Sequence, residues 1–211
     1  MSKEKVRTFP NLADTSIKHQ AALSGGNEHL RSWQYNVADH LKDKTEEQIK
    51  SFLKETSFPY AVLFENLVND FNISSGFRNS NSFNARESFY IGNKKFDRRG
   101  MLGIHNYSDI KWLSTIDEFL QLKTKYKIVG IDNIAGAKSL DTYEWEPNTM
   151  MVFGSEGVGI STAMQDMCEE FVSINQYGSV RSLNVATASG IVMNDFVQKF
   201  VKQKQPNKME N

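Results

Sequence analysis

The chain has 211 residues, which is long enough for one large domain with its own core. Its 25 Lys and Arg side chains balance 25 Asp and Glu side chains, so the overall charge excludes a general attraction to nucleic acid, and an RNA partner would have to meet a local basic patch. One cysteine, Cys168, excludes an intramolecular disulfide, and we expect it to be buried rather than nucleophilic. The four histidines lack metal-ligand spacing, so no metal site is predicted.

The sequence gives no sign of a membrane or secretory segment. No apolar run reaches membrane-spanning length, and the opening residues, MSKEKVRTFP, lack the apolar centre of a secretory signal. We therefore expect a cytoplasmic protein without a membrane partner.

The first regular element is predicted to begin after a polar segment. Residues 1–44 are polar and irregular, and we expect them to form an N-terminal extension that is a candidate RNA-binding segment. Thr45 and Gln48 have capping-box spacing ahead of an apolar stretch, which predicts a helix. Pro59 is expected to end that helix, and a buried strand should follow it over 60–66.

The rest of the chain alternates strand-like and helix-like stretches. Asn72 is predicted to cap a helix, and Thr115 with Glu118 forms a second capping box. Strands are predicted at 88–92, 126–132, 149–154 and 171–175, and helices at 72–83, 114–123, 161–171 and 184–202. Apolar strands separated by helices are typical of an α/β protein with a mostly parallel sheet and helices on both faces. We expect residues 45–203 to form this domain and residues 204–211 a flexible tail.

Three polar loops follow predicted strands, and ligands of open α/β sheets bind at the carboxyl ends of the strands. The first loop leads to Arg78, which is either an ordinary surface arginine or a group that binds a phosphate or a developing oxyanion. The second, GSEGVG at 154–159, lets the backbone approach a ligand, although its spacing is that of neither GxGxxG nor a P-loop. The third turns at Gly178 before Ser182 and Asn184, which stand where a helix begins.

In this order and at this spacing, the loops resemble the three signature motifs of the SpoU/TrmH branch of the SPOUT RNA methyltransferases. The first motif, an Asn followed by an Arg six positions later, is matched by Asn72 and Arg78. The second motif, Gly-x-Glu-Gly-x-Gly, is matched by residues 154–159. The third motif, a Gly followed by Ser-Leu-Asn-Val, is matched by Gly178 and residues 182–185.

The resemblance covers roughly Tyr60 to Phe200, and it has departures. Many relatives have Pro before the Asn of the first motif, where this chain has Phe71. The usual Ile-Pro-Met before the third motif is INQ at 174–176, and the usual small residue after it is Ala186. None of these departures removes a polar group of the motifs.

The resemblance implies a fold and a cofactor. The C-terminal part of the sheet would thread into a trefoil knot, one of the rare exceptions to unknotted topology. The knot loops would bind S-adenosylmethionine, largely through backbone groups. Ile131 and Asp132, at the end of a predicted strand, would border its adenine or ribose. The other positions implied to contact the cofactor are Gly154, Gly157, Ile174 and Leu183.

The implied reaction is methyl transfer to a ribose 2′-hydroxyl, which is a poor nucleophile until it loses its proton. Arg78 would stabilise the alkoxide or a phosphate, because a guanidinium keeps its proton in proteins and is a poor base. Asn72 would hold Arg78 in place, and Glu156 would orient the donors of the second motif. Ser182 and Asn184 would position the reacting nucleotide.

The resemblance also implies that RNA and a second copy of the chain are partners. Family members act as homodimers in which the arginine of the first motif works across or near the interface. The apolar helix at 184–202 suits dimer burial, although ordinary core packing explains it nearly as well. Relatives with short terminal extensions often modify a guanosine in tRNA, so tRNA is the first choice of substrate and rRNA the second.

A basic stretch is the candidate surface for the RNA itself. Its basic side chains alternate with aromatic ones, a pattern that suits phosphates and unstacked bases but also a solvated charged loop. The basic residues are Lys94, Lys95, Arg98 and Arg99, and the aromatic ones are Phe89, Tyr90 and Phe96. The surface could be extended by Lys3, Lys5 and Arg7 at one end of the chain and by Lys199, Lys202 and Lys204 at the other.

Two other functions stay open on the sequence. A catalytically silent, knotted RNA-binding dimer would bind S-adenosylmethionine without transferring its methyl group. A flavodoxin-like or Rossmann nucleotide binder would have an unknotted sheet and no affinity for S-adenosylmethionine.

Overall fold

The computed structural model describes residues 36–66 and 71–204. The chain divides into two units, Met1–Lys42 and Asp43–Asn211. Only the end of the first unit is described, and it contains the 3-10 helix η2 (Asp39–Leu41).

Several predictions fall on parts of the chain that the structure does not describe. Most of the expected N-terminal extension, with Lys3, Lys5 and Arg7, lies outside the described residues. The tail beyond residue 204 and the side chain of Lys204 also lie outside them.

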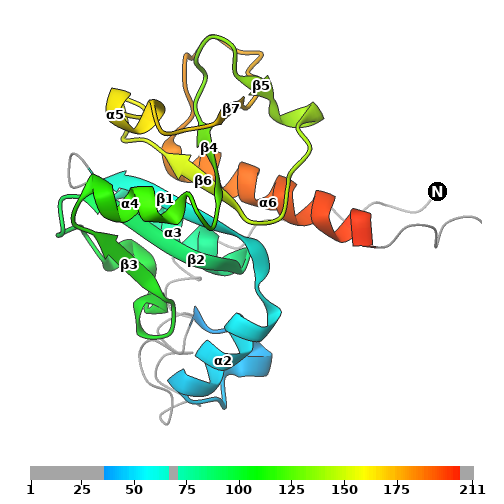
Figure 1. Cartoon of the computed structure of the whole chain (residues 1–211). Helices are drawn as coiled ribbons and strands as arrows, with labels where there is room; N and C mark the ends of the chain where they lie inside the picture. The colour runs from blue at the N-terminus through cyan, green and yellow to red at the C-terminus, as the bar shows by residue number, and fades with distance from the viewer. Residues whose placement is uncertain (1–35, 67–70, 205–211) are drawn as a thin grey trace, which may run out of the picture. The chain divides into compact units, whose positions relative to one another are not determined.

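In the described residues of the second unit, seven strands form one sheet with the order β3-β2-β1-β6-β4-β7-β5 (Figure 1). Each neighbouring pair is parallel. The strands are β1 (Phe58–Asn66), β2 (Ala85–Gly92), β3 (Ile110–Leu113), β4 (Lys127–Ile131), β5 (Lys138–Ser139), β6 (Thr149–Phe153) and β7 (Glu170–Ser173). The predicted α/β fold with a mostly parallel sheet is therefore confirmed, while the trefoil knot stays a prediction.

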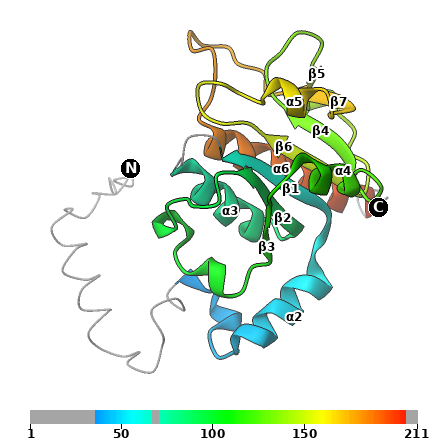
Figure 2. The same cartoon turned by 60° about the vertical axis from the view of Figure 1, so that its left-hand side comes forward.

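Helices cover both faces of this sheet (Figures 1 and 2). On one face, Leu63 of β1 packs in a buried apolar cluster with Phe119 of α4 and Met164 of α5. On the other face, the ring of Tyr60 lies 4.6 Å from that of Phe196 of α6. The helices are α2 (Glu46–Thr56), α3 (Asn72–Ser82), α4 (Ile116–Leu122), α5 (Thr162–Gln165) and α6 (Val185–Lys204), with 3-10 helices η3 (Arg99–Met101), η4 (Ile104–Asn106) and η5 (Leu140–Thr142).

Local capping signals predict where two helices begin. Thr45 Oγ1 accepts from the backbone N of Gln48 at 3.3 Å, and Gln48 Oε1 accepts from the backbone N of Thr45 at 2.9 Å, so the first capping box is confirmed. Thr115 Oγ1 likewise accepts from the backbone N of Glu118, but the Glu118 carboxylate accepts from Ser114 instead of from Thr115. The second box is therefore only half formed.

Other boundaries differ from the prediction. Helix α2 ends at Thr56, and Pro59 lies inside β1, at an irregularity of the β1–β2 register between Phe58 and Ala61. Proline is tolerated there because the ladder is already interrupted. Helix α5 has only four residues, since the chain turns toward β7, where the backbone N of Glu169 donates to the carbonyl of Ile128. Strands β3 and β5 were not predicted, because both are too short to show a recognisable pattern of apolar and polar residues.

None of the helices in the described part of the chain is long and apolar enough to cross a membrane. The expected burial of Cys168 holds in part: it is half-buried, its thiol donates to the carbonyl of Met164, and burial raises its pKa to about 12. A thiol with this pKa carries almost no thiolate at neutral pH, which argues against a nucleophile.

Charged clusters lie among β2, β3, β4 and β7, away from the strand ends that form the site described below. Burial by itself raises the pKa of Glu87, but hydrogen bonds from Lys111, Lys125 and Tyr126 outweigh it and lower this pKa to about 2. Hydrogen bonds from Lys138 and Tyr143 lower the pKa of Glu170 to about 2 as well.

Because of these two carboxylates, the stability of the fold depends on pH. Their pKa is lower in the folded state than the usual 4.5, so their contribution is complete above about pH 4.5 and is lost as the pH falls toward 2. We expect Glu87→Gln to lower the melting temperature at pH 7 and to flatten its decline between pH 5 and pH 2. Parallel melting curves of Glu87→Gln and wild type over that range would contradict this prediction.

Candidate active site

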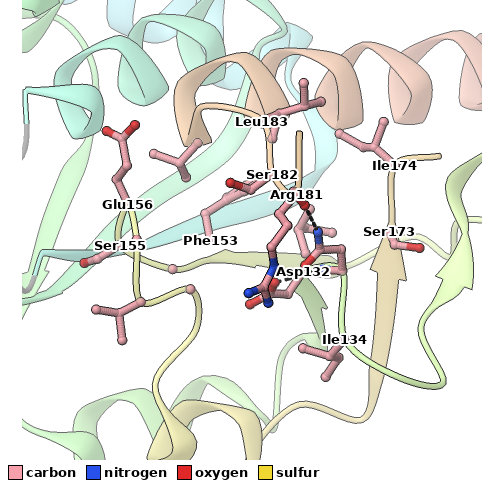
Figure 3. A pocket seen from close by; sticks show the side chains of 18 of the residues that line it. Asp132, Ile134, Phe153, Ser155, Glu156, Ser173, Ile174, Arg181, Ser182 and Leu183 are labelled. Atoms are coloured by element: carbon pink, nitrogen blue, oxygen red, sulfur yellow. Dashed lines mark hydrogen bonds between the residues drawn. The ribbon is translucent and has the colours of Figure 1, made fainter. Parts of the chain in front are cut away.

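A cavity of about 630 Å³ opens where the carboxyl ends of β4, β6 and β7 meet the start of α6. This is the edge at which open parallel sheets bind ligands, and the volume is ordinary for a small-molecule site. The wall is built by segments 131–135, 153–159, 172–174 and 181–183. In Figure 3, Glu156 stands at one end of the cavity and Ile174 at the other.

The loop that follows β6 owes its shape to glycine. The backbone N of Ser155 donates to the carbonyl of Gly159 at 3.1 Å, and the N of Gly159 donates to the carbonyl of Ser155 at 2.9 Å, so the loop closes on itself. A Cβ atom on Gly154 would lie 2.0 Å from the carbonyl carbon of Gly159. Gly157 and Gly159 have φ values of +86° and +73°, in the left-handed region that favours glycine. The loop therefore requires glycine for close backbone contact at one end and for left-handed turns further along.

Two carboxylates, the half-buried Asp132 and the buried Glu65, hold this loop against the sheet. Asp132 Oδ2 accepts from the backbone N of Ile160 at 3.0 Å. Glu65, which is 6% exposed, accepts from the backbone N and the hydroxyl of Ser161 at 2.8 and 2.6 Å. Sequence reasoning missed Glu65, although a carboxylate at the end of a buried strand was a usable signal. Asp132 is thus engaged in shaping the loop as well as in lining the cavity.

A chain of side-chain hydrogen bonds joins the three polar loops. Asn72 Nδ2 donates to Glu156 Oε2, and Asn72 Oδ1 accepts from Asn184 Nδ2 at 2.9 Å. Asn184 Oδ1 then accepts from the backbone N of Ala186 at 3.0 Å and of Thr187 at 3.3 Å. The chain of donors and acceptors fixes the orientation of both amides, because each oxygen and each nitrogen has an assigned partner. Asn184 therefore caps the start of α6, which begins at Val185, and it also takes part in the site.

The predicted capping role of Asn72 is wrong. Asn72 is the first residue of α3, and Phe71, which precedes the helix, makes no side-chain cap. The amide of Asn72 is bound to Glu156 and Asn184 instead. Its amide nitrogen and its amide oxygen are engaged by partners 84 and 112 residues away, so the side chain serves the tertiary structure instead of the helix start.

A second asparagine docks α3 onto α6. Asn79 Nδ2 donates to the carbonyl of Ala186 at 2.6 Å and lies 3.0 Å from the hydroxyl of Ser189. This contact fixes the helix that carries Asn72 against the helix that begins after Asn184. Asn79 was not among the residues predicted from the sequence.

Arg78 lies apart from this group. It is half-buried on α3 and, among the described residues, is not one of those that line the cavity. Its guanidinium makes no hydrogen bond or ion pair with any residue that the structure describes, so it is not bonded to Asn72. Its role stays a prediction.

The other predicted site residues line one cavity. Glu156 and Ser182 are part of its wall and are exposed. All of the predicted cofactor-binding positions also belong to the wall, namely Ile131, Asp132, Gly154, Gly157, Ile174 and Leu183. Sequence reasoning missed Asn133, whose amide donates to the carbonyl of Arg181, and Gln176, which lines the same cavity. The structure thus brings these positions together without testing their roles.

Comparison with known proteins settles the family. Residues 59–194, which include all three loops, match the SpoU rRNA Methylase family. The chain belongs to the SpoU rRNA methylase family. A protein of Mycobacterium avium named an uncharacterized tRNA/rRNA methyltransferase is 37% identical over 67 residues, which are 32% of this chain and 21% of that protein. A protein of the same name from Mycobacterium tuberculosis is 30% identical over 80 residues, 38% of this chain and 24% of that protein. The matches thus span only about a fifth to a quarter of these relatives.

Solved structures share the SpoU fold. The crystal structure of the A. aeolicus TrmH/SpoU tRNA modifying enzyme aligns with a TM-score of 0.66 and 19% identity, covering 75% of this chain and 84% of that one. The SpoU methyltransferase AviRb from Streptomyces viridochromogenes, solved with the cofactor AdoMet, aligns with a TM-score of 0.60 and 22% identity, covering 67% and 57%. At these identities the likeness establishes the fold alone.

The basic stretch of this SpoU protein lies at the same sheet edge as the cavity. It follows the carboxyl end of β2, and Asn66 at the end of neighbouring β1 donates to the carbonyls of Asn93 and Lys95. The basic side chains are exposed, and Arg99 is paired with Asp97. They are Lys94, Lys95, Arg98 and Arg99.

The aromatic half of that prediction is wrong for Phe89 and Tyr90. Phe89 and Tyr90 are 3% and 6% exposed, and Phe96 packs on Tyr90 with ring centroids 5.2 Å apart. Phe89 and Tyr90 belong to the core because alternate residues of β2 face the two helix layers, whereas Phe96 lies beyond the end of β2 and is half-buried. Phe89 and Tyr90 are therefore not available to stack on RNA bases.

Proposed function

We propose that this SpoU-family protein transfers a methyl group from S-adenosylmethionine to a ribose 2′-hydroxyl in RNA, with a guanosine of tRNA as first choice and rRNA as second. The observation that carries the proposal is the hydrogen-bonded chain from Glu156 through Asn72 to Asn184 beside the cavity. It joins three segments, each of which follows a different strand. A structural role alone would not require an exposed carboxylate to be oriented at the end of a ligand-sized cavity.

The cavity suits the proposed cofactor. Gln176 Oε1 is buried in the wall without a hydrogen-bond partner among the described residues. A buried acceptor of this kind favours a ligand that supplies an N–H group, as the amino group of adenine does. The backbone at Gly154 and Gly157 and the apolar side chains of Ile174 and Leu183 would hold the rest of the molecule. When bound, S-adenosylmethionine supplies a methyl group that its sulfonium activates for transfer.

The residues of the chain then have to align the ribose hydroxyl and favour its ionised form. Asn72 orients Glu156, and Asn184 orients Asn72, so Glu156 can accept a hydrogen bond in a fixed direction. Ser182 offers a hydroxyl from another segment of the wall. Arg78 would stabilise the alkoxide or the adjacent phosphate, and the substrate phosphate or water would take the proton.

A homodimer explains the position of Arg78. Because Arg78 does not line the described cavity of its own chain, we place it at the cavity of a second copy. The exposed Lys94, Lys95 and Arg98 would contact the RNA backbone, as would the segment 1–44. We place this activity in the cytoplasm.

Asn72→Asp tests the hydrogen-bonded chain. The substitution keeps the size of the side chain but turns a donor toward Glu156 into an acceptor, so two carboxylate oxygens would face each other. We expect kcat/KM to fall about tenfold or more at pH 8. The kcat/KM of the variant, divided by that of wild type, should rise as the pH is lowered toward 6, because protonation of either carboxyl restores a hydrogen bond.

Two further variants complete this experiment. Asn72→Ala should lose activity without recovering it at lower pH. Asn81→Asp lies on the same helix, where Asn81 donates to the hydroxyl of Ser108, and it should stay close to wild type. A variant-to-wild-type ratio for Asn72→Asp that does not change with pH would rule out the proposed positioning of Glu156.

The proposed function is tested by incubating the protein with bulk tRNA, and separately with rRNA, in the presence of methyl-labelled S-adenosylmethionine. Label in one RNA pool, followed by mapping of a single 2′-O-methylated nucleotide, supports the proposal and names the substrate. Cofactor binding without label in any RNA would favour a catalytically silent RNA-binding dimer. No affinity for the cofactor would overturn the proposal.

A further inference from the structure

Apolar side chains are exposed at the rim of the cavity. The most exposed large apolar side chains among the described residues are Tyr177, Val158 and Val180, at 92%, 68% and 63%. Val158 lines the cavity, and Tyr177 and Val180 lie in the loop between the lining residues Gln176 and Arg181. Single exposed apolar residues are normal on protein surfaces, but these three lie on two loops that contribute residues to one cavity.

The loop that carries Tyr177 is held on both sides of its tip. Before the tip, Asn175 Nδ2 donates to Ser139 Oγ at 2.9 Å and to Asp141 Oδ2 at 2.8 Å. After the tip, the carbonyl of Arg181 accepts from the amide of Asn133. With both ends attached, the intervening residues project from the wall, and the Tyr177 ring makes no ring contact with any residue that the structure describes.

We propose that the Tyr177 ring stacks on an unpaired nucleobase of the RNA substrate, next to the nucleotide whose ribose enters the cavity. The inference rests on the proposed function and names how that substrate is held. Both faces of an almost fully exposed ring are free, and stacking on aromatic rings is the general way in which proteins hold unstacked bases. Arg181, at the end of the same loop, is exposed and lines the cavity, so it can bind the neighbouring phosphate.

A nucleobase suits this rim better than a second copy of the chain does. A stable protein interface buries about 800 Å² on each partner, far more than one tyrosine and two valines can supply. The rim also carries the positive charge of Arg181, which a phosphate satisfies. Gly178 and Ser179 separate Tyr177 from Val180 and leave room for a sugar–phosphate backbone. The substrate must therefore present this nucleotide unpaired, in a loop or a bulge.

The test compares Tyr177→Ala with Tyr177→Phe and Tyr177→Trp in the full chain. On the RNA that wild type methylates, Tyr177→Ala should lower kcat/KM, mainly by raising KM. The decrease should be about 5- to 150-fold, which is the range that base–aromatic stacking gives. The two aromatic variants should stay within a few-fold of wild type, and S-adenosylmethionine affinity should be unchanged in all three. Leu120→Ala, which truncates an exposed apolar side chain on α4, is the control and should behave as wild type.

A second readout follows the base directly. With 2-aminopurine placed next to the methylated nucleotide, binding to wild type should quench its fluorescence, and binding to Tyr177→Ala should not. Wild-type turnover or quenching in Tyr177→Ala would overturn the stacking role, and so would conversion of a dimer to a monomer in that variant. If wild type itself methylates no RNA, the proposed function has failed, and that result is distinct from failure of the stacking role.

Discussion

Arg78→Ala should abolish methyl transfer while it leaves S-adenosylmethionine affinity within a few-fold of wild type. The cofactor cavity is built by the loops after β4, β6 and β7, and Arg78 on α3 is not among its described lining residues. Removing one group that stabilises a developing oxyanion costs about 100- to 1,000-fold in kcat. Calorimetric titration with the cofactor and label transfer to RNA measure the two effects separately.

Controls distinguish this role from a general loss of charge. Arg78→Lys keeps the charge but loses the planar guanidinium, so it should recover only a small part of the activity. Arg86→Ala removes an arginine that donates to Asn148 Oδ1 at 2.7 Å, at the start of β2. That variant should turn over as wild type does. Unchanged turnover in Arg78→Ala would refute the role assigned to Arg78.

Mixed dimers test whether Arg78 acts on its own cavity or on the partner's. One protomer would carry Arg78→Ala and an intact cavity, and the other would carry an intact Arg78 and Asn184→Ala. If Arg78 acts across the dimer, mixing the two inactive variants should restore part of the wild-type activity. Mixtures that exchange subunits and stay inactive would place Arg78 at its own cavity.

Gly154→Ala should have the largest effect on cofactor binding. Its Cβ would lie 2.0 Å from the carbonyl carbon of Gly159 and 2.2 Å from the backbone N of Ile160. Both are backbone atoms of the loop that lines the cavity, so they cannot move away as a flexible side chain can. The loop must open, which would break the contact from Asp132 to Ile160. We expect the Kd for S-adenosylmethionine to rise at least about tenfold, in line with the usual cost of overpacking.

Gly178→Ala is the matched comparison for cofactor affinity. A Cβ atom there would meet nothing within 4 Å, and its φ is not in the left-handed range. It should bind S-adenosylmethionine as wild type does and melt at the same temperature. Equal cofactor affinity in Gly154→Ala and Gly178→Ala would show that the tight loop is not part of the binding site.

Much of the fold could be predicted because its signals are local. The capping box at Thr45 and the start of α6 at Asn184 depend on groups within a few residues of each other, so the sequence shows them directly. Runs of buried residues such as those of β1 and β6 have the length and composition of central parallel strands. The short β3 and β5 could not be predicted, because their pairing partners and not their own patterns make them strands.

The sequence by itself determined the order of the longer strands and helices, the parallel sheet and the positions of the three polar loops. Only the tertiary structure decided what the side chains of those loops bind. Asn72 joins Glu156 and Asn184, which are 84 and 112 residues away, and Glu65 holds Ser161, 96 residues away. Hydrogen-bond partners at such separations are set by strand order and helix docking, which no local period or propensity encodes. For the same reason, the rings of Phe89 and Tyr90 proved to be buried, and the exposed ring of Tyr177 appeared in the loop next to the cavity.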